Sequence, residues 1–471
     1  MKVLLSTNDY LIILAYFIIV LVIGFKTKTA DNSIKDYLVA GRTLTLPAFV
    51  ATLVSSFYGG ILGIGEFTYS YGISGWLLYA FPFYLFITFF AFFLADKIRK
   101  AHLYTIPDKL FRVYGKKVSI FAGILIFLLA TPAPFLFMLG ILIRIIFGFN
   151  IIYAMIIALI LSVLYLYKGG FRADVRVNIF EFILMFVGFG IILPFCFNLL
   201  GGFDYLQSRL AEQYLTLTGG LTIQIFFVWF FIGSWVLIDP VFHQRCYAVK
   251  NKKTPKRGII ISLVFWIIFD FLTTTAGLYA KAFVNINEIP SALYSYPALA
   301  EKILPPIAKG VFFVGLIATV MSSLHSYMFI SATTFSKDII SRIKNSSDEE
   351  NSYTAIGLIV SSIFSLVLAY LIPSVVNIWY TIGTMIIPAL LISVLSSYFP
   401  KYQVHSRYIL LAMLGSFSVS LISFSIGHLN SIEGSPVYPF FIEPMYPGLI
   451  TGLIIYLIGF KNRKYLQTVT D

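Results

Sequence analysis

The sequence predicts an all-α protein that crosses a membrane many times, and three observations support this fold class. Hydrophobic residues make up 59% of the 471 residues, whereas charged residues make up 12%. The mean hydropathy is +0.89. Apolar blocks of about the 20 residues that a membrane-spanning helix needs follow one another along the chain. A soluble core of this size would need less apolar surface, so much of it must face lipid, and little of the chain is left for a separate soluble domain.

Apolar blocks bounded by charged residues, glycine or proline predict thirteen helices. Their expected ranges are 9–25, 46–66, 74–95, 119–147, 150–167, 177–199, 222–240, 258–280, 307–335, 353–372, 375–397, 407–426 and 445–460. The first block lacks a small-residue cleavage site and continues into the basic stretch 26–35. We therefore expect it to be a retained helix and not a signal peptide.

The positions of the basic residues test this span count independently of hydropathy. With the N-terminus outside, the inside segments are 26–45, 96–118, 168–176, 241–257, 337–352, 398–407 and 461–471. Of the 34 Lys and Arg, those outside these segments are Lys2, Arg144, Arg209, Lys281, Lys302 and Lys309. Because Lys and Arg are enriched in cytoplasmic loops, this predicts a multi-pass protein of the cell membrane with a cytoplasmic C-terminus. The net charge of +13 then reflects topology, and we expect no nucleic acid as a partner.

Several kinds of chemical site are not supported. The two cysteines, Cys196 and Cys246, form neither a disulfide framework nor a thiolate metal site. The sequence also contains no Walker-type phosphate loop and no zinc-type His/Glu spacing. We therefore do not expect an enzyme.

The predicted helix 46–66 gathers small and flexible residues at mid-membrane depth. They are Ser55, Ser56, Gly59, Gly60, Gly63 and Gly65. Such a run weakens a helix, and transporters use interrupted helices because the freed carbonyl groups can bind a cation. Small residues also permit close helix packing, so the run by itself leaves both interpretations open.

A second interruption lies five helices further on, in the predicted helix 222–240. This helix contains Gly233-Ser234-Trp235 and ends at Asp239-Pro240. Paired interruptions in corresponding places of two halves indicate an inverted-repeat transporter with a site near the midplane of the membrane. Alternatively, Asp239 is a helix-end carboxylate that pairs with Arg245 at the inner surface.

Hydroxyl groups gather in the predicted helix 307–335, at Thr319, Ser322, Ser323 and Ser326. Sodium is a hard cation, and hydroxyl and carbonyl oxygens can replace its water without desolvating a full charge. Ser322 and Ser323 would form such a site if they faced the carbonyl groups of the broken helix 46–66. The alternative is that each serine bonds to a carbonyl one turn earlier in its own helix.

A charge within a span is costly and indicates function by default. Asp270 lies in the middle of the predicted span 258–280, and Glu181 lies one turn into 177–199. Glu66 and Arg144 lie toward outer helix ends, where snorkelling explains them. Asp270 is too deep to snorkel, so we expect it to contact a substrate or ion, or else a neighbouring hydroxyl.

Together, several segments resemble the sodium:solute symporter family. They are Asp36–Arg42, Thr105–Gly115, Gly169-Gly170-Phe171, Asp239–Lys250 and the stretch from Met321-Ser322-Ser323 to Lys337-Asp338. Their order and spacing cover the chain from about residue 30 to residue 400, and the thirteen-helix topology with the N-terminus outside is similar to that of the family.

The resemblance implies a LeuT-type core of two inverted five-helix repeats, here 46–199 and 222–397, with one helix before the core and two after it. It implies a sodium ion bound by the side chains of Ser322 and Ser323 and the carbonyl groups of Leu53, Ser56 and Thr319. It also implies a substrate site lined by Ser55, Gly60, Trp235, Tyr380 and Thr384. We add Asp270 to the expected substrate contacts because of its depth.

One position departs from the family. Where the family has an Asp on the inner route by which sodium leaves, this sequence has Asn178, and Glu181 stands at the place of a Gln. An amide can coordinate sodium but supplies no charge. Glu181 could restore a carboxylate one turn away, or the ion coupling could differ.

The expected function is sodium-driven import of a small organic solute by alternating access, and an amino acid is the favoured class of solute. Proton coupling through Asp270 or Glu181 is one alternative. Another is a membrane sensor that kept the fold and lost transport, which the departure at Asn178 motivates. No kinase or receiver domain follows the last predicted helix, which argues against the sensor.

Overall fold

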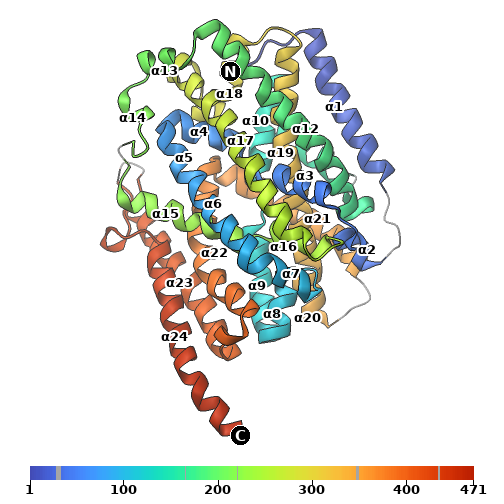
Figure 1. Cartoon of the computed structure of the whole chain (residues 1–471), viewed down its shortest axis with the longest axis vertical. Helices are drawn as coiled ribbons and strands as arrows, with labels where there is room; N and C mark the ends of the chain where they lie inside the picture. The colour runs from blue at the N-terminus through green and yellow to red at the C-terminus, as the bar shows by residue number, and fades with distance from the viewer. Residues whose placement is uncertain (28–32, 165, 220, 346–349, 433–434, 471) are drawn as a thin grey trace.

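Long apolar helices build the molecule in the computed structural model (Figure 1). The structure describes residues 1–27, 33–164, 166–219, 221–345, 350–432 and 435–470, and only the backbone for residues 168, 350–353 and 464–470. Within these residues, ten helices or continuous helix runs are long and apolar enough to cross a membrane, and one bent helix pair raises this number to eleven. The prediction of an all-helical, polytopic membrane protein is therefore confirmed. Parts of the predicted segments 26–45, 337–352 and 461–471 lie outside the described residues.

The first half of the chain contains the helices up to α14. They are α1 (Thr7–Lys26), α2 (Ile34–Val39), α3 (Leu46–Phe57), α4 (Ile61–Tyr71), α5 (Ile73–Tyr79), α6 (Phe81–Phe89), α7 (Ala95–Ala101), α8 (Ile106–Tyr114), α9 (Lys116–Leu129), α10 (Ala133–Phe147), α11 (Ile151–Val163), α12 (Leu166–Leu200), α13 (Phe203–Arg209) and α14 (Glu212–Leu215). A 3₁₀ turn, η1 (Ala40–Arg42), follows α2, and a π-helical segment, η2 (Phe90–Leu94), joins α6 to α7. The run Ile73–Ala101 forms one span.

The second half begins with the second interrupted helix. Its helices are α15 (Ile223–Gly233), α16 (Pro240–Ala248), α17 (Thr254–Phe283), α18 (Ser295–Ile303), α19 (Ala308–Thr333), α20 (Arg342–Lys344), α21 (Glu350–Leu371), α22 (Val375–Tyr398), α23 (Ser406–Leu429) and α24 (Met445–Thr470). Between them lie the short segments η3 (Ser234–Leu237), η4 (Ile286–Glu288), η5 (Ala292–Tyr294), η6 (Thr334–Ser341), η7 (Pro400–Tyr402) and η8 (Pro439–Phe441).

The span count is lower than the thirteen that hydropathy predicts. The predicted helices 150–167 and 445–460 correspond to α11 and α24, which are not among the candidate spans in the described part of the chain. For α11 the reason is length, because its apolar helix covers only Ile151–Val163. Ten to eleven spans are therefore supported, and thirteen stays a prediction.

Two predicted inside segments are helical, which corrects their expected boundaries. Residues 168–176 belong to α12, which bends at Gly170, where φ is +50°. Residues 241–248 belong to the buried helix α16. Both segments carry charged residues that hydropathy predicts to be exposed to water. Two of these charges are paired within the protein instead: the partly buried Arg172 with Asp36, and the fully buried Arg245 with Asp174.

The predicted break in the first core helix lies between α3 and α4, whose axes differ by 55°. A Cβ added at Gly59 would lie 2.0 Å from the Ser323 hydroxyl oxygen, and one added at Gly60 would lie 2.2 Å from the Trp379 ring. Only glycine leaves room for these two side chains. The small residues therefore serve both an interruption and close packing, the two interpretations that the sequence leaves open.

The second predicted interruption is also present. α15 gives way at Gly233 to the 3₁₀ turn η3, and the chain becomes α-helical again at Pro240. Asp239 caps α16, since its carboxylate accepts a hydrogen bond from the Val241 N–H at 2.7 Å. Asp239 is thus a buried cap in mid-span, and Arg245 makes its ion pair with Asp174 and not with Asp239.

α19 is the central helix of the bundle, and every residue of its most apolar window is buried. It packs most extensively on α12, where Gly188 and Gly315 bring the two backbones together; a Cβ added at Gly188 would lie 2.7 Å from the Gly315 Cα. α1 lies at one edge of the molecule and α23 with α24 at the opposite edge (Figure 1). The hydroxyl patch of α19 is therefore held at the centre.

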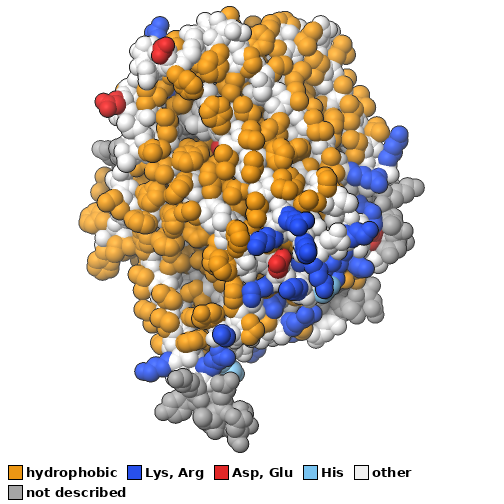
Figure 2. All heavy atoms as spheres, viewed as in Figure 1, with side chains coloured by type: hydrophobic (Ala, Val, Ile, Leu, Met, Phe, Trp, Pro, Cys, Tyr) orange, Lys and Arg blue, Asp and Glu red, His pale blue; other side chains and the backbone are white. Residues whose placement is uncertain are grey.

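The surface shows how the molecule would sit in a bilayer. Figure 2 shows hydrophobic side chains over most of the visible face, with Lys and Arg gathered toward the end that carries α7 and α8. Apolar side chains of α1 such as Leu11, Leu14 and Ile18 are exposed. Lipid is the solvent that such a surface requires.

The close contact between α12 and α19 yields a stability prediction. We expect Gly188→Ala to lower the thermal unfolding midpoint in detergent, with a loss of about 1–3 kcal/mol, because the new methyl group meets backbone that cannot rotate away. Gly190→Ala in the same helix is the control, since a Cβ there meets nothing within 4 Å. Equal midpoints for the two variants would contradict this packing.

Candidate functional site

The candidate site begins where the last turn of α3 meets the middle of α19. The Ser322 hydroxyl lies 2.8 Å from the carbonyl oxygens of both Ser55 and Thr319. The Ser323 hydroxyl lies 2.5 Å from the Ser56 carbonyl oxygen. Because α3 ends at Phe57, the carbonyl groups of its last turn lack partners within the helix. The hydroxyl groups of α19 supply those partners across the break.

This contact has the chemistry of a hard-cation site. Ser56, Thr319, Ser322 and Ser323 are fully buried, as is Leu53 one turn earlier in α3. Hydroxyl and carbonyl oxygens are the groups that replace the water of an alkali cation. Ser322 contacts both its own helix and α3, so both alternatives that the sequence leaves open are true of Ser322, whereas the hydrogen bond of Ser323 is made to α3.

A buried ion pair lies directly beside this contact. Nη2 of Arg245 on α16 lies 3.0 Å from Oδ2 of Asp174 on α12, and 2.8 Å from the hydroxyl oxygens of both Ser56 and Ser326. Ser326 donates to Oδ1 of Asp174 at 2.7 Å. Both charged side chains are almost completely buried. One guanidinium group therefore links α3, α12, α16 and α19.

Asn178 and Glu181 lie next to this ion pair on α12. The Asn178 amide donates to the hydroxyl groups of Ser56 and Ser326 at 3.1 Å. Glu181 accepts a hydrogen bond from Tyr16 of α1 at 2.7 Å, and its other oxygen lies 3.9 Å from Nδ1 of His325. The region thus contains a carboxylate one turn before Asn178, at Asp174, as well as the one at Glu181.

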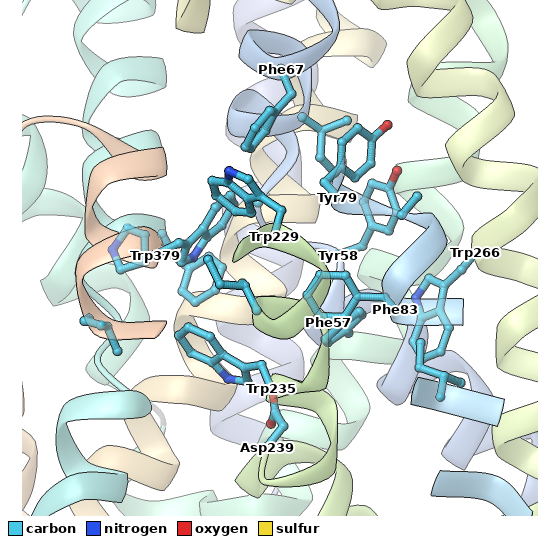
Figure 3. Close-up of a pocket in the computed structure, with 18 of the residues that line it drawn as sticks. Phe57, Tyr58, Phe67, Tyr79, Phe83, Trp229, Trp235, Asp239, Trp266 and Trp379 are labelled. Carbon is cyan, nitrogen blue, oxygen red and sulfur yellow. The ribbon is translucent and has the colours of Figure 1, made fainter. Parts of the chain in front are cut away.

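A cavity of about 140 Å³ lies on the other side of the α3–α4 break. Both interruptions line it, the first with Phe57, Tyr58 and Gly60 and the second with Trp235 and Asp239. Its wall is mainly aromatic and contains four of the five tryptophans of the chain, Trp229, Trp235, Trp266 and Trp379. In Figure 3, Trp229, Trp235 and Trp379 lie on one side, and Phe57, Tyr58, Tyr79 and Phe83 face them.

Two carboxylates belong to the cavity wall. Asp270 of α17 accepts hydrogen bonds from the phenolic hydroxyls of Tyr58 and Tyr84, one to each oxygen. Asp239 accepts one from the Tyr327 hydroxyl at 2.7 Å. Asp270 therefore contacts neighbouring hydroxyls and also lines a cavity, and its contact with a substrate or ion stays a prediction.

Three of the six predicted substrate contacts lie outside the cavity wall. Gly60, Trp235 and Asp270 line the cavity, but Ser55, Tyr380 and Thr384 do not. The Ser55 and Thr384 hydroxyls bond within their own helices, and Tyr380 contacts Glu443 before α24. The sequence analysis does not predict that Tyr58, Tyr84, Trp266 and Trp379 line the cavity. Only their aromatic character within spans could have marked them.

Comparison with known proteins adds independent evidence. The profile of the sodium:solute symporter family matches residues 37–402. The chain is 25% identical to the sodium/pantothenate symporter of Haemophilus influenzae over 93% of both chains. It is 22% identical to the sodium/glucose cotransporter of Vibrio parahaemolyticus, over 78% of this chain and 75% of that one.

Solved structures are similar in fold. The substrate-bound, outward-open structure of a Na⁺-coupled sialic acid symporter matches with a TM-score of 0.80 at 16% identity, covering 98% of both chains. A manganese transporter of Eremococcus coleocola matches with a TM-score of 0.52 at 11% identity, over 93% of this chain and 97% of that one. The fold is thus the LeuT-type fold that the sequence resemblance implies.

The buried ion pair yields a second prediction. We expect Asp174→Asn to destabilise the protein by about 3–5 kcal/mol, because it leaves the Arg245 guanidinium buried without its counter-charge. Combining it with Arg245→Gln removes both charges, so the double variant should regain much of the loss. The measurement is the thermal unfolding midpoint of all variants in one detergent. Additive losses in the double variant would show that the pair does not act as a unit.

Proposed function

Because the chain belongs to the sodium:solute symporter family, we propose that it imports a small organic solute by alternating access, driven by the inward sodium gradient. Sodium-coupled solute symport is the activity of the family, and the chain is a transporter and not an enzyme. The observation that carries the proposal is the contact of the Ser322 and Ser323 hydroxyls with the carbonyl groups of the broken helix α3, beside a cavity lined by both interruptions.

In this proposal, sodium binds between α3 and α19. Ser322 and Ser323 would supply hydroxyl oxygens, and Leu53, Ser56 and Thr319 would supply carbonyl oxygens. The hydroxyl groups donate to carbonyl oxygens in the present structure. They would rotate so that their lone pairs face the ion, which exchanges hydrogen bonds for ion contacts without moving a charged side chain.

Sodium binding and solute binding would be coupled because the break between α3 and α4 belongs to both sites. Sodium would tie α3 to α19 and stabilise the arrangement in which Tyr58 and Gly60 complete the cavity wall. If sodium favours solute binding, solute must favour sodium binding by the same factor. Rocking of one helical bundle against the other, with 46–199 and 222–397 as the inverted repeats, would then open the inner side.

We infer that the end rich in Lys and Arg is cytoplasmic, with the N-terminus outside and the C-terminus inside, as positive-inside topology requires (Figure 2). The solute is a small organic molecule. An amino acid is the class that the sequence analysis expects, although no described residue of the cavity wall offers a positive charge to its carboxylate. Its amino group could approach Asp270, whereas Gly60 and Trp235 would contact its body. Ser55, Tyr380 and Thr384 would act indirectly, because they lie outside the cavity wall.

A second candidate mechanism is proton coupling. One oxygen of Glu181 and the Oδ1 atom of Asn178 are buried without a hydrogen-bond partner in the described part of the chain. A proton on Glu181 would provide a donor in this region. Asp270, between two phenolic hydroxyls, is the other group that could carry a proton.

The sodium site yields a third prediction. We expect the thermal unfolding midpoint of the wild-type protein to be higher in sodium chloride than in potassium chloride, because sodium binding stabilises the folded state. This stabilisation amounts to about 2.7 kcal/mol when the sodium concentration is a hundred times Kd. Ser322→Ala combined with Ser323→Ala should abolish this difference. Ser331→Ala is the control, since this buried α19 hydroxyl has no hydrogen-bond partner in the described structure and should leave it unchanged.

The transport assay uses proteoliposomes with an inward sodium gradient, and with potassium in its place, against labelled amino acids, amines, sugars, carboxylates and vitamins. Sodium-dependent accumulation of one compound that the double serine variant loses would support the proposal. A folded protein that accumulates none of them and gains no stability from sodium would overturn it.

The proton alternative has its own test. If sodium alone is coupled, Glu181→Gln should leave the pH dependence of initial uptake unchanged, and an imposed proton gradient should drive no accumulation without sodium. A proton-driven component that Glu181→Gln or Asp270→Asn removes would instead favour proton coupling. The initial rate of uptake at several pH values, with and without sodium, distinguishes these outcomes.

A further inference from the structure

The cavity wall differs from that of a site for a neutral or anionic solute. Among the described residues that line it, none is Lys, Arg or His, whereas two are Asp. Most of the remaining lining residues are aromatic or aliphatic. A carboxylate or phosphate group entering this cavity would meet no positive side chain and two negative ones.

The two carboxylates have no counter-charge of their own. The ion pairs in the described part of the chain include neither Asp239 nor Asp270. Arg245, on the helix that Asp239 caps, is committed to Asp174. Both Asp239 and Asp270 are buried, and a buried charge is costly unless it is paired. A positively charged occupant would supply the missing charge.

Part of the hydrogen-bonding capacity that a polyhydroxylated solute would need is already used within the wall. Each hydroxyl of a sugar requires its own partner when buried. The phenolic groups of Tyr58 and Tyr84 already donate to Asp270, and that of Tyr327 donates to Asp239. These three phenolic donors are therefore already used to hold the carboxylates in place.

Tryptophan faces are the strongest aromatic partners for a cation. Trp229, Trp235 and Trp379 lie together on one side of the cavity, and Tyr58 lies on the other (Figure 3). The rings of Trp229 and Phe67 pack in a T-shaped arrangement, with their centroids 4.8 Å apart. Aromatic cages of this kind bind substituted ammonium ions, whose charge is spread over an apolar surface.

We propose that the solute carried by this protein is a small organic cation, a substituted ammonium ion, held between the tryptophan faces with Asp270 and Asp239 as its counter-charges. This inference rests on the proposed function, because it takes the cavity as the transport site. Sodium and solute would then be bound by different chemistry: sodium by the neutral oxygens of α3 and α19, and the organic cation by carboxylates and rings.

The test compares three ligands of nearly equal shape on the purified full chain. Choline carries a positive charge, 3,3-dimethylbutan-1-ol is its uncharged isostere, and glycine betaine is the related zwitterion. Because four tryptophans line the cavity, intrinsic fluorescence reports binding directly. In sodium chloride, we expect choline to bind at least about tenfold more tightly than either of the other two.

Asp270→Asn should weaken choline binding about tenfold or more, because it removes a counter-charge while keeping the shape of the side chain. Glu66→Gln is the matched control, since Glu66 lies outside the cavity wall; it should leave affinity within about twofold. Asp239→Asn serves as a second variant if Asp270→Asn does not fold, because asparagine still caps α16.

The outcomes separate this inference from the proposed function. Binding of the alcohol or of betaine as tightly as choline, no binding of choline, or an unchanged choline affinity in the folded Asp270→Asn and Asp239→Asn variants would overturn the organic cation. In each case, if sodium still stabilises the wild-type protein and this effect depends on Ser322 and Ser323, the proposed sodium symport would stand. Loss of that stabilisation in the wild-type protein would overturn the proposed function, and this inference with it.

Discussion

The gap between α3 and α4 is the constraint on which the rest of the structure depends. In a bilayer, backbone polar groups must be satisfied within the protein, so a helix can stop at mid-depth only where its free carbonyl groups find partners. The hydroxyl groups of Ser322 and Ser323 are those partners. Gly59 and Gly60 make the approach possible, because Ser323 and Trp379 occupy the space of their missing side chains. One contact thus satisfies the break and brings hydroxyl and carbonyl oxygens together beside the cavity to which Tyr58 belongs.

Buried charge is divided between the two sides of this break. Beside the oxygen-rich contact, Asp174 and Arg245 neutralise each other within a network that includes Ser56, Ser326 and Asn178. In the cavity, the hydrogen bonds that described residues donate to the carboxylates of Asp239 and Asp270 come from neutral groups. An uncompensated charge in a low-dielectric interior acts strongly on whatever enters. If the cavity is the transport site, as we propose, these carboxylates would select the charge of its ligand.

Family membership and ligand choice rest on different features of the chain. The sodium:solute symporter profile matches residues 37–402, and the fold of the sialic acid symporter covers 98% of the chain, so both concern the chain as a whole. The chain is 25% identical to a relative named for pantothenate and 22% identical to one named for glucose. A fold of this kind does not specify a solute. In our proposal the side chains that line the cavity do so, and in this protein they are mainly aromatic and aliphatic residues with two aspartates.

The sequence by itself determined the features that depend on local composition. Hydropathy predicted the all-helical membrane protein, and small residues at 55–65 and at 233–234 located both interruptions. The serine pair on one helix predicted the oxygen contact that Ser322 and Ser323 make. Only the tertiary structure placed residues 168–176 and 241–248 in helices, because their charges look solvated until Asp174 and Arg245, far apart in the chain, are seen to pair. The cavity wall was equally out of reach: Trp235, Asp270 and Trp379 come from three distant helices, whereas Ser55 and Thr384 bond within their own. Which face of a helix looks into a cavity is decided by its packing partners, and a local pattern does not contain them.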